Sequence, residues 1–458
     1  MTKTRIVFAM AVLALIGAKR RAVEVTQPPV VELRAERSFA ITEKSVLAPF
    51  TLDRVLAALI AHSVAPSTTP EQFFRRMFDT QNPKPGLDAS LPHCDDILLN
   101  GKPALNGYAR RCPTAEGVLA NEPFRPEQFV PVAIVNRFDL ADPNGATCGQ
   151  YRITFERDSG NPLNLLNIIF EGALRNPLPS TGIEGCRPIA QFWANLSAID
   201  SIAERRARLE AFFFDGVAGF PPLLHPDHFR DAPAGIRDMQ WTGLTTTAPR
   251  FYQFRIVNQC DGGACRVYAK PDLLENLASG RLLDGSDTSD RATRFRDVVV
   301  DNVKNLALPD ANRFSMKIPS EFLMVENDPG DGVAHFLLLA GFQRGARTPA
   351  GMEFRARVES ELRTSGSTMT VEELLTRGSI TNCEGCHVSL TGPIGDEIWF
   401  PAAGPDLQHV ARTLVESGEE GTGSRYTLSF AMKSVFIPNR MRILKEFLAS
   451  GKAPAPSK

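Results

Sequence analysis

The spacing of apolar residues predicts both helices and strands in the first three quarters of the chain. Apolar residues recur at helical intervals in four segments, 51–63, 188–196, 199–213 and 290–306. Apolar alternation or β-branched runs predict strands in three others, 129–138, 151–156 and 165–170. These segments follow no regular strand–helix–strand order. We therefore expect region 46–348 to be α+β with an antiparallel sheet.

Two helix starts carry a stronger local signal than periodicity. Thr69 is followed three residues later by Gln72, and Thr370 is followed by Glu373 in the same way. Each pair forms a capping box, in which the two side chains bond each other's backbone N–H groups. We expect a helix to begin directly after Thr69 and another directly after Thr370.

Helical patterns dominate the C-terminal region. They fall in the segments 354–362, 371–377, 407–416 and 440–448. We therefore expect a small all-α domain at 349–450, following the larger disulfide-containing α+β region. The segments 22–45 and 451–458 show little periodicity, and we interpret them as a linker and a disordered tail.

The N-terminus resembles an export signal. Lys3 and Arg5 precede an apolar run at 6–18, which is shorter than the ~20 residues of a membrane span. We predict a signal peptide at 1–21, with an uncleaved N-terminal anchor as the alternative. No later apolar run reaches spanning length, so the expected location is periplasmic or secreted.

Composition and charge narrow the classes of partner. The 458 residues are 43% hydrophobic and 22% charged, which is typical of a globular protein, and the net charge is −1. This balance gives no reason to expect nucleic acid as a partner.

Six of the eight cysteines suggest disulfides, as expected in an exported chain. Cys260 and Cys265 flank Asp261-Gly262-Gly263-Ala264 between two short strands, so they would face each other across a hairpin. Six cysteines allow 15 pairings, and joining sequence neighbours gives Cys94–Cys112 and Cys148–Cys186. Free buried thiols are the alternative.

The remaining two cysteines belong to the pentapeptide Cys383-Glu384-Gly385-Cys386-His387. On a helix, Cys383, Cys386 and His387 share one face, which suits two thiols bonded to haem vinyl groups and an imidazole beneath the iron. A thiol–disulfide redox motif would normally follow a strand, and a structural zinc site would need a second cysteine pair. A plain disulfide is the remaining alternative.

With this motif, the preceding helix and a closing helix, the C-terminal region resembles a cytochrome c domain. The resemblance covers less than a quarter of the chain. It implies one covalent haem c on Cys383 and Cys386, with His387 as the proximal iron ligand. Segments 399–410 and 436–440 also resemble, loosely, uncharacterised secreted bacterial proteins with a haem motif.

Two residues are candidates for the distal iron ligand, His409 and Met432. If 407–416 is a helix, its apolar stripe points away from His409, which favours a solvated histidine. Met432 lies in the apolar run 430–437, where a core methionine is the ordinary interpretation. Both candidates therefore stay open.

Three functions are compatible with the sequence, and the first two use the haem. The favoured one is electron transfer or redox sensing with a redox partner protein. The second is a peroxidase-like haem oxidoreductase, which would need an open iron site and an acid–base residue. The third is an exported binding module, in which the cysteine pair is a disulfide or a thiol redox motif.

Other polar groupings are weaker candidates. We interpret His225 and His228 as members of a surface loop, and His335 as a core histidine. The acidic groups near Asp139 and Glu326 match no calcium-loop spacing, so ordinary turns are expected there. These groups comprise Asp139, Asp142 and Asn144, and Glu326, Asp328 and Asp331.

Overall fold

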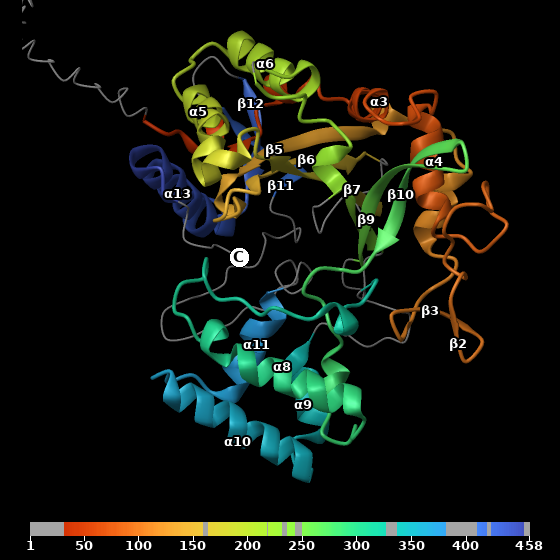
Figure 1. The fold of residues 1–458 in the computed structure, drawn as a ribbon, viewed down its shortest axis with the longest axis vertical. Coiled ribbons are helices and arrows are strands. Elements are labelled where there is room, and N and C mark those ends of the chain that lie inside the picture. The colour runs from red at the N-terminus through yellow and green to blue at the C-terminus, as the bar shows by residue number, and fades with distance from the viewer. Residues whose placement is uncertain are drawn as a thin grey trace, which may run out of the picture.

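The computed structural model describes residues 32–158, 164–217, 219–230, 236–242, 250–326, 337–381, 410–418 and 423–452. Figure 1 shows a sheet with its covering helices in one half of the molecule, and the helices α8 to α11 in the other. The predicted signal peptide, the predicted haem motif and all of the predicted disordered tail except residues 451 and 452 lie outside the described residues. Within the described ranges, no helix is long and apolar enough to cross a membrane.

The larger half is built on a seven-stranded antiparallel sheet, which confirms the predicted fold class for this part. A row of apolar residues runs across four strands, from Ile41 through Ile134 and Ile153 to Phe170, and all four are buried. This cross-strand packing fixes the register, because a slip of one residue would turn the row to the other face. In spatial order the strands are β1 (Ala40–Ile41), β5 (Phe129–Arg137), β6 (Thr147–Arg157), β7 (Asn164–Arg175), β8 (Ile236–Thr242), β9 (Arg250–Asp261) and β10 (Ala264–Asp272).

Helices cover this sheet and complete the main hydrophobic core. The predicted helix at 51–63 is present as α3, and the Thr69–Gln72 capping box begins α4 as expected. These helices are α1 (Ala35–Ser38), α2 (Lys44–Leu47), α3 (Leu52–Ala61), α4 (Pro70–Asp79), α5 (Arg187–Leu196), α6 (Ile202–Glu210), α7 (Asp227–Arg230) and α13 (Ile437–Ser450). A small sheet beside α4 contains β2 (Leu98–Leu99), β3 (Lys102–Leu105) and β4 (Tyr108–Ala109).

Short helical turns connect many of these elements. The 3-10 turns are η1 (Ala115–Ala120), η2 (Pro126–Gln128), η3 (Phe138–Leu140), η4 (Pro179–Cys186), η6 (Gly280–Leu283) and η7 (Ser320–Phe322). The π turns are η5 (Ala211–Asp215) and η8 (Met432–Phe436), each joined to an α-helix.

A second hydrophobic core lies among four helices. They are α8 (Asp290–Leu306), α9 (Leu338–Gly345), α10 (Pro349–Thr364) and α11 (Val371–Ile380). The bounds of α8 match the prediction, because Ser289 caps its N-terminus and its buried residues follow helical spacing. The capping box of Thr370 and Glu373 begins α11, also as predicted.

The predicted helix at 407–416 is wrong. From residue 410, where the described residues resume, the chain instead forms the strand β11 (Val410–Ser417), which pairs with β12 (Ser424–Leu428). The described part of 349–450 is therefore not all-helical. It also divides between the two cores, because α10 and α11 pack with α8, whereas α13 packs in the main core.

The structure contains three disulfides with the pairing given by sequence order: Cys94–Cys112, Cys148–Cys186 and Cys260–Cys265. The last joins facing residues of the β9–β10 hairpin, whose turn glycines Gly262 and Gly263 have positive φ. Three disulfides are consistent with an oxidising, extracytoplasmic location.

Candidate functional site

The haem motif lies between two well-packed segments of the described chain. Cys383, Cys386 and His387, together with His409, fall outside the described residues. Helix α11 leads toward the motif and ends at Ile380, three residues before Cys383. Helix α11 itself is fixed by the cap at its start and by its burial in the second core.

An apolar cluster joins the end of α11 to the π turn η8, which precedes α13. Ile380 packs with Phe314 and Ala311, and the partly buried Val435 and Phe436 pack against them. We call these five residues the Phe314 cluster. It brings the end of α11 close to the π turn η8, although the two are more than 50 residues apart in sequence.

Met432, a candidate distal ligand, begins this π turn. It is 6% exposed and packs in the main core, and its N–H donates to the Ser429 hydroxyl at 3.3 Å. Met432 is thus in the same π turn as Phe436 of the Phe314 cluster. Its burial in the main core also suits an ordinary core methionine.

Two buried arginines flank the Phe314 cluster. Arg377 lies 5.0 Å from the Phe314 ring centre and donates from Nη1 to the carbonyls of Leu306 and Leu308 at 2.8 and 2.7 Å. Arg440 lies 5.9 Å from the ring centre of Phe436. Burial lowers the pKa of both guanidinium groups.

Arg440 is incompletely neutralised by its surroundings. Its Nε is 3.8 Å from Oδ1 of Asp139, but Asp139 is already bonded by Arg137, at 2.9 to 3.2 Å. Burial and, next, repulsion from Arg137 lower the pKa of Arg440 to about 9. Nη1 of Arg440 has no hydrogen-bond partner among the described residues. A buried cation in this state favours an additional anionic group nearby.

The histidine loop gathers a third histidine that sequence spacing did not indicate. His62, from the end of α3, lies 5.4 Å from His225, which lies 6.1 Å from His228 (ring centres). His225 Nδ1 accepts from the N–H of Asp227, so its lone pair is already used. In the described part of the chain, no group of three or more His, Cys, Asp or Glu residues could hold a metal ion.

The surface-loop interpretation is correct for His225 and wrong for His228. His225 is partly exposed, whereas His228 is 5% exposed and its Nδ1 lies 2.7 Å from the Leu223 carbonyl. Burial lowers the pKa of His228 to about 4. The side chain is thus a neutral, buried hydrogen-bonding group.

The predicted Asx turn is confirmed, because Asp142 Oδ1 accepts from the N–H of Asn144 at 2.6 Å. Asp139 does not join this turn and is buried beside Arg137 and Arg440.

Glu326 is a buried carboxyl whose setting the sequence did not reveal. Its Oε1 accepts from the N–H of Arg111 at 2.7 Å, and its Oε2 accepts from the Tyr252 hydroxyl at 3.1 Å. Burial raises the pKa of Glu326 to about 7, against the opposing effects of Arg111 and Arg110. Asp328 and Asp331, which the sequence grouped with Glu326, lie outside the described residues, as does the predicted core histidine His335.

Comparisons with protein-family models, with curated proteins and with solved structures find no match to this chain. The functional assignment therefore depends on its own residues.

Proposed function

We propose that this chain is an exported c-type cytochrome with one covalently bound haem, and that it transfers or senses electrons in the periplasm or outside the cell. Cys383 and Cys386 would form the two thioether bonds, and His387 would be the proximal iron ligand. The observation that carries the proposal is the pentapeptide Cys383-Glu384-Gly385-Cys386-His387.

The disulfides support this use of the pentapeptide. Eight cysteines are present, and six of them form the three disulfides. This leaves Cys383 and Cys386 as the two that are available for other chemistry. A four-cysteine zinc site has no second pair, because Cys260 and Cys265 are bonded to each other. A thioredoxin-like motif normally follows a strand, whereas here the preceding element is the helix α11.

The described residues around the end of α11 also suit a haem group. A haem has a broad apolar face and two anionic propionates. The Phe314 cluster offers apolar and aromatic surface, and Arg377 and Arg440 are buried cations at its border. Arg440 has a donor without a partner among the described residues, so a propionate is a chemically suitable neighbour.

The chain's residues would set how the haem behaves, since bound haem supplies one-electron redox chemistry. His387 would hold the iron on one side, and either Met432 or His409 would occupy the other. Methionine ligation gives a higher reduction potential than a second histidine. Buried cations such as Arg440 stabilise the reduced, less positive iron and so also raise the potential.

Visible spectra of the purified exported protein test the proposal. The oxidised and dithionite-reduced spectra and a pyridine haemochrome assay should show haem c in the wild type. The double variant Cys383→Ala/Cys386→Ala should lack it, whereas Cys260→Ala/Cys265→Ala should retain it as the matched control. Absence of haem from the wild type, after expression with a working attachment system, would refute the proposal.

Two further readouts define the axial ligand. A weak far-red band in the oxidised protein, lost in Met432→Leu but kept in Met369→Leu, would assign Met432 as the distal ligand. Rapid carbon monoxide binding by the reduced wild type would instead indicate an open iron site. That result would favour the peroxidase-like alternative over electron transfer.

A further inference from the structure

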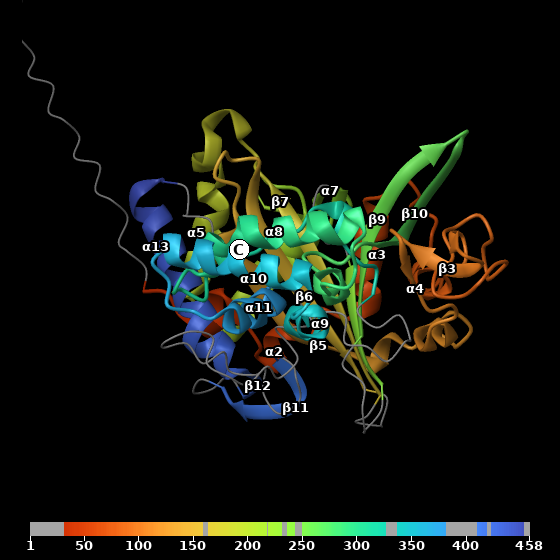
Figure 2. The same cartoon turned by 90° about the horizontal axis from the view of Figure 1, so that it is seen from below.

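A polar cleft lies between α4 and β10, in the half of the molecule that contains the sheet. Its volume is about 360 Å³, which is within the range of small binding sites. Strand β10 is the last strand in the sheet order, so among the described strands one side of it is unpaired. Figure 2 shows the β9–β10 hairpin projecting from the body of the molecule, with α4 beside it.

The cleft follows the free edge of β10. Residues 264–268, five consecutive positions, all line it. Successive side chains of a strand point to opposite faces of the sheet. A cleft that contacted only the side chains of one face would be lined by alternate residues. Lining by five consecutive residues indicates that this cleft also reaches main-chain atoms of β10, whose outward N–H and C=O groups are unpaired in an edge strand.

Positive charge lies on both walls of the cleft. Arg76 comes from α4 and Arg266 from β10. Asp88 also lines the cleft and attracts both arginines, at 3.5 Å from Arg76, so it offsets one of the two positive charges. Arg266 also donates to the Ser90 hydroxyl at 3.1 Å. The N-terminal turn of α4 adds the positive end of its dipole, because Gln72 also lines the cleft.

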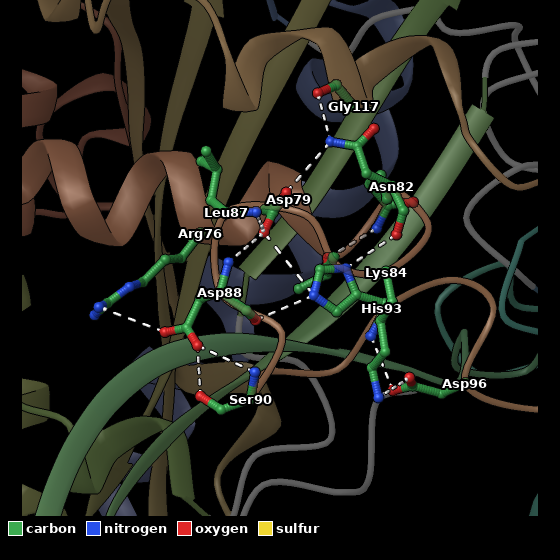
Figure 3. A network of polar contacts seen from close by, with 12 residues as sticks. Arg76, Asp79, Asn82, Lys84, Leu87, Asp88, Ser90, His93, Asp96 and Gly117 are labelled. Carbon is green, nitrogen blue, oxygen red and sulfur yellow. Dashed lines mark hydrogen bonds and ion pairs between the residues drawn. The ribbon is translucent and has the colours of Figure 1, made fainter.

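A buried network holds the wall that carries Asp88 (Figure 3). The two ring nitrogens of His93 lie 3.1 Å from the carbonyl oxygens of Asn82 and Asp88. Oδ2 of Asp79 accepts from the N–H groups of Leu87 and Asp88, at 2.7 and 3.2 Å. These bonds join the end of α4 to the following loop, so this wall is preformed and a ligand need not order it.

We propose that this cleft binds an extended acidic peptide segment, which adds to the free edge of β10 as a further antiparallel or parallel strand. Main-chain hydrogen bonds to β10 would supply sequence-independent affinity, as in other strand-addition sites. Arg76 and Arg266 would each bond a carboxylate of the peptide, and this would select acidic sequences. The proposal is independent of the haem.

Fluorescence anisotropy with synthetic peptide pools tests this site on the full-length protein. Each labelled heptapeptide has Glu at alternate positions and a mixture of Val, Leu, Thr and Phe between them; a matched pool has Lys in place of Glu. We expect saturable binding of the Glu pool and at least tenfold weaker binding of the Lys pool. A third pool, N-methylated at alternate amides of the Glu peptides, should also bind at least tenfold more weakly.

Variants assign the binding to the cleft. Arg76→Ala and Arg266→Ala should each weaken binding of the Glu pool about tenfold, and Arg266→Glu should reverse the preference toward the Lys pool. Arg255→Ala is the matched control, because Arg255 lies on the neighbouring strand β9, outside the cleft, and pairs with Asp272. Equal binding of the N-methylated pool would show a simple anion site and overturn strand addition. No binding of the Glu pool, or equal loss in Arg255→Ala, would overturn the site itself.

Discussion

Acidification should destabilise the native protein through His228. This side chain is 5% exposed, and burial is the main cause that lowers its pKa from the ordinary 6.5 to about 4. Between pH 4 and pH 6.5 the unfolded chain binds a proton at this histidine, whereas the native protein does not. The contribution of neutral His228 to stability is therefore full above pH 6.5 and is lost as the pH falls toward 4. One pKa unit corresponds to about 1.4 kcal/mol, and the whole loss is therefore about 3 kcal/mol.

His228→Asn is the variant that isolates this effect. The asparagine amide can replace Nδ1 of His228, which lies 2.7 Å from the Leu223 carbonyl, but it does not titrate. Urea unfolding of both proteins should be measured from pH 4 to pH 8 with the same cofactor content. Relative to the wild type, His228→Asn should gain about 3 kcal/mol of stability between pH 7 and pH 4. A stability difference that does not change with pH would refute this account of His228.

Three further predictions concern local structure. Brief treatment with a dilute phosphine reductant, followed by alkylation and peptide mapping, should open Cys260–Cys265 before the other disulfides, because both of its residues are exposed. Thr370→Ala should lower the free energy of unfolding by about 1 kcal/mol in urea titrations, because it removes the N-terminal cap of α11. Thr370→Ser keeps a capping hydroxyl, so its free energy of unfolding should stay close to that of the wild type. Phe155→Ala should cost about 3 to 5 kcal/mol in the same assay, because this fully buried ring lies in the main core, where it packs edge-on against Phe170.

Elements with local end signals could be predicted from the sequence. The helix at 290–306 has the predicted bounds, and both capping boxes form as expected. These signals act within four residues, so they do not depend on the rest of the fold. The Cys260–Cys265 hairpin is similar, because the two glycines between the cysteines favour a tight turn.

The segment 407–416 shows where periodicity fails. Leu407, Val410 and Leu414 have helical spacing, but a short apolar run fits a strand equally well. Antiparallel pairing with β12 makes the described part of this segment a strand. In addition, the N–H of Arg412 donates to Glu156 of β6, 256 residues away. Such a distant partner leaves no trace in the local pattern.

The candidate site also contains parts that the sequence predicts and parts that it does not. The predicted haem motif is recognisable because Cys383, Cys386 and His387 lie within five positions. The Phe314 cluster is not, because its members come from three separate segments that meet only in the folded chain. An arginine in an amphipathic helix, such as Arg440, is ordinarily expected at the surface, so its burial could not be inferred from composition or spacing.

Glu326 should have the opposite pH dependence to His228. Burial raises its pKa from the ordinary 4.5 to about 7. The native protein therefore binds a proton that the unfolded chain has released, and this contribution is full below pH 4.5 and is lost as pH rises through 7. The loss is about 3 kcal/mol, similar to that of His228 but opposite in sign. Between pH 4.5 and 6.5 the two contributions should cancel.

This cancellation can be tested with four proteins: the wild type, Glu326→Gln, His228→Asn and the double variant. Glu326→Gln keeps an acceptor for the Arg111 N–H, which donates to Glu326 at 2.7 Å, but removes the titration. Between pH 4.5 and 6.5, the stability of Glu326→Gln should rise with pH relative to the wild type, and that of His228→Asn should fall. The double variant should again run parallel to the wild type, because the two sites lie in separate hydrogen-bond networks. If both single variants changed in the same direction with pH, the burial argument for Glu326 would be wrong.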